Sequence, residues 1–328
     1  MNKPKLLATH ALFEAPQQKL AEFFDAEFWT APERPPRAEL LHRVADKDAL
    51  ICLLTEKIDD ELLAAAPNLR IVANVAVGFD NIDLEACTRH HVAASNTPGV
   101  LDETTADFAW TLLLAVARRL IEGDTFARSG KWTGWNLDQL CGADVWDKTL
   151  GILGLGRIGQ AVARRAQGFG MHVIYNDAKR APVEIEQRLN AEYVSHDAVL
   201  SQADFLTLHV PLLPETRGLI GTIELAQMKQ TAFLINTSRG PVVNEAALIH
   251  ALEKNLIAGA ALDVYEHEPQ IPDGLRRPNV VLAPHLASAS VETRTKMAMI
   301  AAENAIAPFE GRRPPNILNP AAFEGRKS

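Results

Sequence analysis

Short apolar runs alternate with amphipathic, helix-like stretches from the start of the chain. Residues 5–8, 49–54 and 70–75 are apolar runs of strand length, whereas residues 58–66 have the spacing of a helix. Strands that are apolar throughout are buried on both faces, which is typical of a parallel sheet whose connections are helices. The pattern predicts a small α/β domain over residues 1–98.

The second half of the chain repeats this pattern at greater length. A turn at 96–99 leads into a long periodic helix over 104–122, and a last helix is expected over 291–309. Apolar runs of strand length recur between helical segments at 149–153, 172–176, 204–208, 231–236, 258–262 and 279–282. Six strands joined by helices predict a second doubly wound parallel sheet.

A glycine-rich stretch follows the first of these six runs. Gly154, Gly156 and Gly159 form the pattern G-x-G-x-x-G between a predicted strand and a predicted helix. In a dinucleotide-binding turn, the first glycine makes the tight turn and the second lets the backbone approach the pyrophosphate. The third lets helix and strand pack closely, and the helix N-terminus offers N–H groups to the phosphates. The stretch therefore predicts a bound dinucleotide.

The residues after the next strand bear on which dinucleotide binds. Asp177 lies about 20 positions after Gly154, where a carboxylate accepts hydrogen bonds from the ribose hydroxyls of NAD and repels a 2′-phosphate. Lys179 and Arg180 follow at once, and two cations there are suited to hold the 2′-phosphate of NADP. The expected cofactor is NAD(H) or NADP(H), with NADH favoured.

Composition and charge narrow the possible partners. The 328 residues carry a net charge of -8, which argues against a nucleic-acid surface. Cys52, Cys87 and Cys141 are far apart and form no C-x-x-C pair, so neither a disulfide framework nor a metal site is predicted. No apolar run approaches the roughly 18 residues of a membrane span, and the N-terminus lacks the pattern of a signal peptide. We expect a cytoplasmic protein that binds small molecules, without membrane partners.

The loop expected over residues 123–147 is rich in tryptophan. It holds Trp132, Trp135 and Trp146, three of the five tryptophans in the chain. One tryptophan would usually pack beneath its own loop, whereas three close together favour a contact between subunits. We therefore expect a homodimer.

Five further segments resemble motifs of the D-isomer-specific 2-hydroxyacid dehydrogenases. They are the substrate loop, the domain crossover, and the arginine, glutamate and histidine motifs, at residues 74–83, 96–101, 235–240, 261–269 and 283–288 respectively. The resemblance covers essentially the whole chain. It implies a flavodoxin-like substrate domain and a Rossmann NAD(P)-binding domain, with an active-site cleft between them. The first would comprise residues 1–98 and 289–328, and the second residues 99–288.

The resemblance also implies catalytic residues whose chemistry suits the reduction of a 2-keto acid. Arg239 has a planar guanidinium that can hold a carboxylate. A histidine titrates near neutral pH and suits proton donation. His285, which follows Pro284 at the end of a predicted strand, matches the family motif, unlike His209, which also ends a strand. Glu268, directly before a proline, matches better than Glu266. It would accept a hydrogen bond from the imidazole and stabilise the imidazolium.

Further contacts follow from the resemblance alone. The main-chain N–H groups of Val77 and Gly78 are expected to bind the substrate carboxylate, and Asp263 is expected to face the nicotinamide carboxamide. The other cofactor contacts implied are Thr105, Arg157, Ile158, His209, Pro211, Thr216, Thr237, Ser238 and Ala287.

Within the family, residues 104–110 and 128–135 are most similar to glyoxylate/hydroxypyruvate reductases. The implied products are glycolate or D-glycerate. The 2-ketogluconate reductases are close neighbours, and two positions depart from the usual motifs. Ala287 replaces a glycine, and Gln139 stands where some hydroxypyruvate reductases have tryptophan. The alternative to an enzyme is a nicotinamide-sensing, corepressor-like binding protein, which would share the fold and the catalytic residues.

Overall fold

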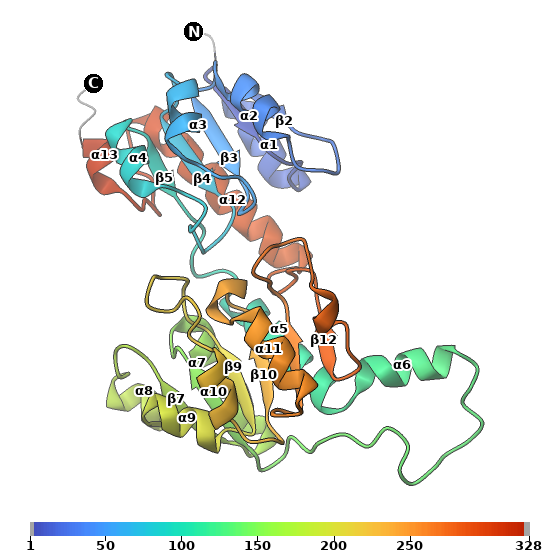
Figure 1. The fold of residues 1–328 in the computed structure, drawn as a ribbon. Helices are drawn as coiled ribbons and strands as arrows, with labels where there is room; N and C mark the ends of the chain where they lie inside the picture. Colours follow the sequence, from blue (N-terminus) through green and yellow to red (C-terminus); the bar gives the residue numbers. More distant parts are fainter. Residues whose placement is uncertain (1–2, 325–328) are drawn as a thin grey trace. The chain divides into compact units, whose positions relative to one another are not determined.

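Two parallel sheets, each covered by helices on both faces, form the structure, a computed structural model in which residues 3–324 are described (Figure 1). The chain divides into a first unit, residues 1–101 and 290–328, and a second unit, residues 102–289. The predicted fold class, two doubly wound parallel sheets, is confirmed. Among the helices described, none is both long and apolar enough to cross a membrane.

The sheet of the first unit has the strand order β2-β1-β3-β4-β5, the flavodoxin-like order. Its strands are β1 (Lys5–Ala8), β2 (Asp25–Phe28), β3 (Ala49–Cys52), β4 (Ile71–Asn74) and β5 (Ala93–Ser95). The apolar pattern predicts the three central strands but misses β2 and β5. Both are edge strands, β2 is only partly buried and β5 has three residues, so neither carries a long apolar run.

Helices cover both faces of this sheet. On one face lie α2 (Arg37–Val44), α3 (Asp60–Ala65) and α4 (Leu84–Arg89), and on the other lie α1 (Glu14–Phe23) and α12 (Val291–Ile306). A last helix, α13 (Pro320–Glu324), packs against α4 and β5. Helix α12 comes from far along the chain and buries Ala301, Ala302 and Ala305 among the residues of the sheet. These small side chains let the helix approach the strands closely, so the C-terminal segment completes the first unit.

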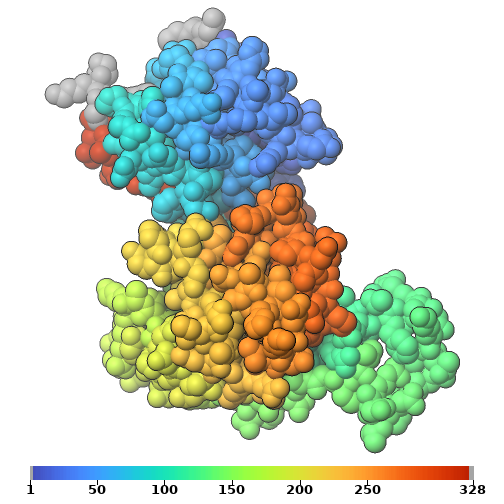
Figure 2. All heavy atoms as spheres, in the orientation of Figure 1, coloured from blue at the N-terminus to red at the C-terminus, as the bar shows by residue number. Residues whose placement is uncertain are grey.

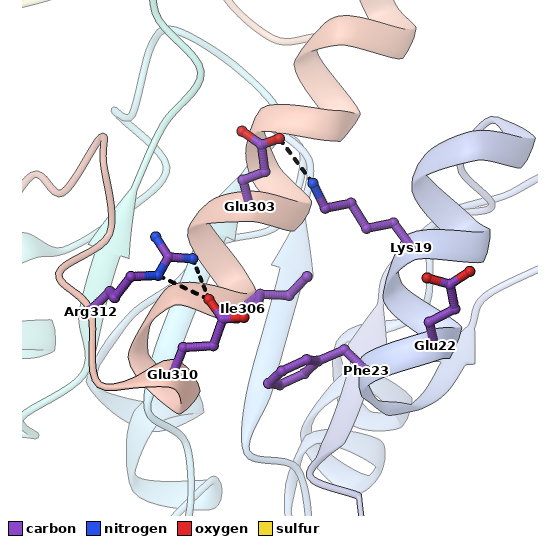
Figure 3. Close-up of a pocket in the computed structure, with 7 residues that line it drawn as sticks. All are labelled: Lys19, Glu22, Phe23, Glu303, Ile306, Glu310 and Arg312. Carbon is purple, nitrogen blue, oxygen red and sulfur yellow. Dashed lines mark hydrogen bonds and ion pairs between the residues drawn. The ribbon is translucent and has the colours of Figure 1, made fainter.

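An ion pair and aromatic contacts join α12 and its continuation to α1 and the residue after it. Figure 3 shows a polar pocket between them, where Lys19 lies 2.9 Å from Glu303 and Arg312 pairs with Glu310. Such half-exposed ion pairs stabilise little. Phe309 also meets Phe24 edge to face, with ring centroids 5.2 Å apart. The predicted helix over 291–309 is α-helical only to Ile306, and a 3-10 turn (Ala307–Glu310) follows.

The second unit contains seven strands in the order β12-β11-β10-β9-β6-β7-β8, the Rossmann order with one strand added. They are β6 (Thr149–Leu153), β7 (His172–Asn176), β8 (Ala191–Tyr193), β9 (Phe205–Leu208), β10 (Phe233–Asn236), β11 (Gly259–Leu262) and β12 (Val280–Leu282). The sequence pattern predicts six of these and misses β8. That strand has three residues, lies at the edge, and includes an exposed glutamate.

Two sets of helices cover this sheet. One hydrophobic cluster joins it to α5 (Asp102–Ala117) and α7 (Arg157–Ala166), and it includes α8 (Val183–Leu189). The other joins it to α9 (His196–Gln202), α10 (Thr222–Gln227) and α11 (Glu245–Glu253). Three short 3-10 turns complete the unit: Gln167–Phe169, Gly240–Val242 and Asp273–Leu275.

The prediction of one helix over 104–122 is wrong. Helix α5 ends at Ala117, Arg119 takes a left-handed conformation with φ 52°, and a separate helix α6 (Leu120–Arg128) begins. The returning chain closes on this break, because the N–H of Ala143 donates to the carbonyl of Ala117 at 2.8 Å. No residue of α6 is buried. Helix α6 and the loop that follows it to residue 141 project from the second unit as an arm (Figures 1 and 2), and the chain then returns to the unit, where Val145 is buried.

Candidate active site

The three predicted catalytic residues follow three adjacent strands of the second unit. Arg239 comes after β10, Glu268 after β11 and His285 after β12. Since these strands are parallel, their carboxyl ends lie along one edge of the sheet, where ligands of such sheets bind. Strand order therefore brings together residues that are up to 46 positions apart in the sequence.

Glu268 and His285 form a direct hydrogen bond. The imidazole Nδ1 lies 2.9 Å from Glu268 Oε2, and the other carboxylate oxygen accepts the N–H of Tyr265 at 3.1 Å. Burial alone would raise the pKa of Glu268. The hydrogen bond and charge of His285, together with the positive charge of Arg239, outweigh burial and hold this pKa below its ordinary value. Glu268 is therefore an ionised acceptor that fixes the orientation of the imidazole.

Asp263 holds the turn that carries His285. Its carboxylate accepts the N–H groups of Leu286 at 2.6 Å and Ala287 at 2.8 Å, and its carbonyl accepts the N–H of His285 at 2.9 Å. His285 has φ 56°, a strained value for a residue other than glycine, so the turn depends on these three bonds. Asp263 is fully buried, and burial raises the pKa of its carboxyl. Sequence reasoning did not anticipate this supporting contact.

A buried asparagine shapes the loop of Arg239. Asn236 ends β10, and its amide donates to the carbonyl of Arg239 at 3.0 Å. Its side-chain oxygen accepts both the N–H and the hydroxyl of Ser238, at 3.0 and 2.8 Å. A side chain on Gly240 would come within 1.9 Å of the Tyr265 carbonyl carbon, so this loop requires glycine there. Arg239 itself is half-buried.

The three fingerprint glycines differ in what surrounds them. Gly154 has φ 93°, and a Cβ on Gly159 would lie 2.1 Å from the carbonyl oxygen of Gly154, so packing requires both glycines. A Cβ on Gly156 would meet no protein atom within 4 Å. Gly156 caps α7, whose N-terminus is suited to bind phosphate. The open space at Gly156 fits a dinucleotide whose pyrophosphate approaches the backbone there.

Asp177 and the two cations after it have distinct partners. The Asp177 carboxylate accepts the N–H of Leu155, inside the fingerprint loop, at 2.7 Å. The guanidinium of Arg180 donates twice to Glu186, each time at 2.9 Å. Arg180, followed by the Tyr175 hydroxyl, lowers the pKa of Glu186 to about 2. The side chain of Lys179 is exposed and makes no ion pair with any residue that the structure describes.

Two of the remaining predicted cofactor contacts form the turn after β9, and His209 begins it. Burial lowers the pKa of His209 to about 3, so its imidazole is neutral, and its Nε2 lies 2.9 Å from the Thr207 hydroxyl. The Thr216 hydroxyl donates to the carbonyl of Pro211 at 2.6 Å and accepts the N–H of Leu213 at 2.8 Å. These bonds close the turn over residues 211–216.

The other predicted contacts lie at helix starts and strand ends. Thr105 is buried in α5, Ile158 is half-buried in α7, and Arg157 lies 3.3 Å from Asp102. Thr237, directly after β10, buries a hydroxyl that has no hydrogen-bond partner within residues 3–324. A buried hydroxyl of this kind is suited to a polar atom of a ligand. It is a second feature that fits a bound dinucleotide.

Val77 and Gly78 belong to the first unit. They lie in the loop after β4, and both are half-exposed. The side chains that shape this loop, those of Asn74 and Asn96, were not predicted as site residues. Across the described chain, no group of three or more His, Cys, Asp or Glu side chains is arranged to hold a metal ion.

Known proteins share this sequence and this fold. Residues 110–287 match the model of the family described as D-isomer specific 2-hydroxyacid dehydrogenase, NAD binding domain. The glyoxylate reductase of Korarchaeum cryptofilum is 50% identical over 320 residues, covering 97% of this chain and 96% of that protein. A solved structure from Thermus thermophilus is 42% identical with a TM-score of 0.91, covering 96% of this chain and 99% of that one. An NADPH-dependent glyoxylate/hydroxypyruvate reductase of Sinorhizobium meliloti, solved with NADP and malonate, is 33% identical with a TM-score of 0.86, covering 100% of both chains.

Proposed function

This chain belongs to the D-isomer specific 2-hydroxyacid dehydrogenase family, and we propose that it reduces glyoxylate or hydroxypyruvate to the D-2-hydroxy acid, with NADH or NADPH as the reductant. The hydrogen bond between His285 and Glu268, beside the charge of Arg239, is the observation that carries the proposal. It combines a proton donor with a cation suited to a carboxylate. The names of relatives about 50% identical support the substrate class.

Each side chain has one role in this reaction. The second unit would hold a reduced dinucleotide, whose chemistry there would be to supply a hydride to the carbonyl carbon. Arg239 holds the substrate carboxylate through its planar guanidinium. His285 transfers a proton from Nε2 to the carbonyl oxygen, which becomes the hydroxyl of the product. Glu268 accepts the Nδ1–H, which keeps Nε2 toward the substrate and stabilises the imidazolium before transfer.

We assign the dinucleotide to the second unit. In addition to Arg239, we assign the main-chain N–H groups of Val77 and Gly78 to the substrate carboxylate. The pyrophosphate would bind at Gly156 and the N-terminus of α7, and the ribose hydroxyls at Asp177. The other dinucleotide contacts proposed are Thr105, Arg157, Ile158, Lys179, His209, Pro211, Thr216, Thr237, Ser238, Asp263 and Ala287.

We propose that NADH is the preferred reductant. Arg180 is engaged by Glu186, which leaves Lys179 as the one nearby cation without an ion pair among the described residues. The Asp177 carboxylate would repel a 2′-phosphate. The Sinorhizobium enzyme, by contrast, is NADPH-dependent.

A substrate panel tests the proposed function. Purified protein is offered glyoxylate, hydroxypyruvate and 2-ketogluconate, each with NADH and with NADPH, while absorbance of the reduced nicotinamide is followed. The highest kcat/KM with the two small acids is expected. A preference for 2-ketogluconate would make the protein a sugar-acid reductase. Tight dinucleotide binding without oxidation in any pair would favour the sensing protein instead.

We further propose that the arm mediates homodimer formation. Trp135 and Leu137 are 79% and 82% exposed, and Leu120 and Ile121 on α6 are also exposed. Large apolar side chains gathered on one projection mark a protein contact. A second copy of the chain is the proposed occupant. Light scattering should find a dimer that becomes monomeric in the W135S/L137S variant and stays dimeric in L213S, which alters an exposed leucine outside the arm.

The free cysteines are consistent with a location in the cytoplasm. Cys52 and Cys87 are buried thiols and Cys141 is an exposed one. Free thiols of this kind persist in a reducing compartment. We therefore propose a cytoplasmic enzyme.

A further inference from the structure

The loop after β4 is held by its carbonyl groups. The carbonyl of Ala76 accepts the N–H of Thr97 at 2.9 Å, and the carbonyl of Val77 accepts the side-chain amide of Asn96 at 2.8 Å. In a trans peptide the C=O and the next N–H point in opposite directions. Anchoring these two carbonyls therefore turns the N–H groups of Val77 and Gly78 away from their anchors.

Asn74 anchors the following peptide. It is the last residue of β4 and is fully buried, and its amide donates to the carbonyl of Gly78 at 3.0 Å. The same amide lies 3.3 Å from Asn81 Oδ1. The Asn74 side-chain oxygen accepts the thiol of Cys52 at 3.6 Å, and burial raises the pKa of that thiol, so it remains a donor. Asn74 is thus fixed in the orientation that directs its amide to the loop.

The two asparagines bracket the most flexible residue of the loop. Asn96 fixes the peptide before Gly78, and Asn74 fixes the peptide after it. Glycine has more backbone freedom than any other residue, so without these bonds the peptides around Gly78 would rotate. Neither Val77 nor Gly78 donates its N–H to another described residue, and both residues are half-exposed.

We propose that Asn74 is a positioning residue for the substrate carboxylate: by holding the peptide after Gly78, it prevents the rotation at Gly78 that would disturb the N–H groups of Val77 and Gly78, which Thr97 and Asn96 direct toward the anion. This inference rests on the proposed function and extends it to residues that touch neither substrate nor cofactor. It also predicts which kinetic constant the amide controls. A preorganised donor affects binding of the carboxylate rather than the reduction or dinucleotide binding.

The variant N74S tests the proposal, with N319S as its matched control. A serine at position 74 is too short to reach the Gly78 carbonyl. Asn319 is also a buried asparagine of the first unit whose amide donates to a main-chain carbonyl, that of Val92 at 3.0 Å. Both variants should lower the melting temperature. Only N74S should raise the KM for glyoxylate, by about tenfold, with kcat and the KM for NADH changed by less than about twofold.

A substrate without a carboxylate separates positioning from a general loss of structure. With glyoxal, which keeps the aldehyde and lacks the carboxylate, N74S and the native protein should have the same kcat/KM. An unchanged KM for glyoxylate in N74S, an equal loss with glyoxal, or the same rise in N319S would each overturn the proposal. If N74S does not fold, N81A should raise the same KM by a smaller factor, because Asn81 Oδ1 lies beside the Asn74 amide.

Binding of oxalate distinguishes failure of this proposal from failure of the proposed function. Oxalate carries the carboxylate and cannot be reduced, so its affinity is measured by calorimetry without turnover. Weaker oxalate binding in N74S than in N319S would support the positioning role even if the native protein reduced none of the keto acids. Equal oxalate affinities in native protein, N74S and N319S would overturn it.

Discussion

Each unit of the protein has a loop that follows a parallel strand and that we propose binds an anion, but the two loops are shaped by opposite means. Residues 154–159, after β6, are shaped by the absence of side chains, because no Cβ fits at Gly154 or Gly159 without meeting backbone. Residues 75–81, after β4, are shaped by the presence of side chains, since Asn74 and Asn96 hold the main-chain carbonyls. The first arrangement leaves a visible spacing of glycines in the sequence, whereas the second does not.

The largest loss of activity is expected from a substitution that lies outside both loops. In H285A the proton donor is lost, so kcat for glyoxylate should fall by roughly 10²–10⁴-fold while the Kd for NADH changes by less than about twofold. Stopped-flow turnover and a fluorescence titration measure the two quantities. Native turnover in H285A would remove His285 from the mechanism and with it the role of Glu268.

Gly156 separates ligand binding from packing within the glycine loop. In G156A the Kd for NADH should rise by about tenfold or more, because the added methyl meets the approaching pyrophosphate and no protein atom. The free energy of unfolding should fall by less than about 1 kcal/mol, the cost of alanine at a helix cap. G168A is the control, since a Cβ there also meets nothing within 4 Å. An unchanged Kd in G156A would contradict the proposed pyrophosphate site.

The pH profile tests the support given to His285. The pKa of Glu268 lies below its ordinary value, so its carboxylate is charged throughout the neutral range. Glutamine carries no charge to stabilise the imidazolium, so the deficit in reductive kcat/KM of E268Q relative to the native protein should grow as the pH rises. Rates measured from pH 5 to about pH 9 give the profile. If E268Q instead lowered reductive kcat/KM by the same factor at every pH, Glu268 would have only a structural role.

The smallest effect concerns the choice of dinucleotide. K179A should raise the KM for NADPH by about threefold and leave the KM for NADH unchanged, since one exposed cation contributes little. R180A is the matched comparison. It should not alter the ratio of the KM for NADPH to the KM for NADH, because Arg180 is paired with Glu186. A larger change of this KM ratio in R180A than in K179A would contradict the proposal that Glu186 keeps Arg180 from the 2′-phosphate of NADPH.

The same contrast explains which parts of the fold and of the candidate site can be predicted from the sequence. The central strands and the edge strand β12 appear as apolar runs, whereas the edge strands β2, β5 and β8 include polar or half-exposed residues and lack such runs. The break between α5 and α6 is missed because periodicity does not encode the left-handed turn at Arg119. The hydrogen bond from Asn74 to Gly78 and the bonds from Asp263 to the turn of His285 follow no motif that can be read from the sequence. Only the structure identifies them.

Analysis of the product shows whether the protein is a D-specific 2-keto acid reductase. Hydroxypyruvate and NADH are incubated with the native protein, the NADH consumed is measured by absorbance, and the glycerate formed is resolved by chiral chromatography. We expect D-glycerate alone, one molecule for each NADH oxidised. Formation of L-glycerate, or no glycerate from hydroxypyruvate and no glycolate from glyoxylate, would contradict it.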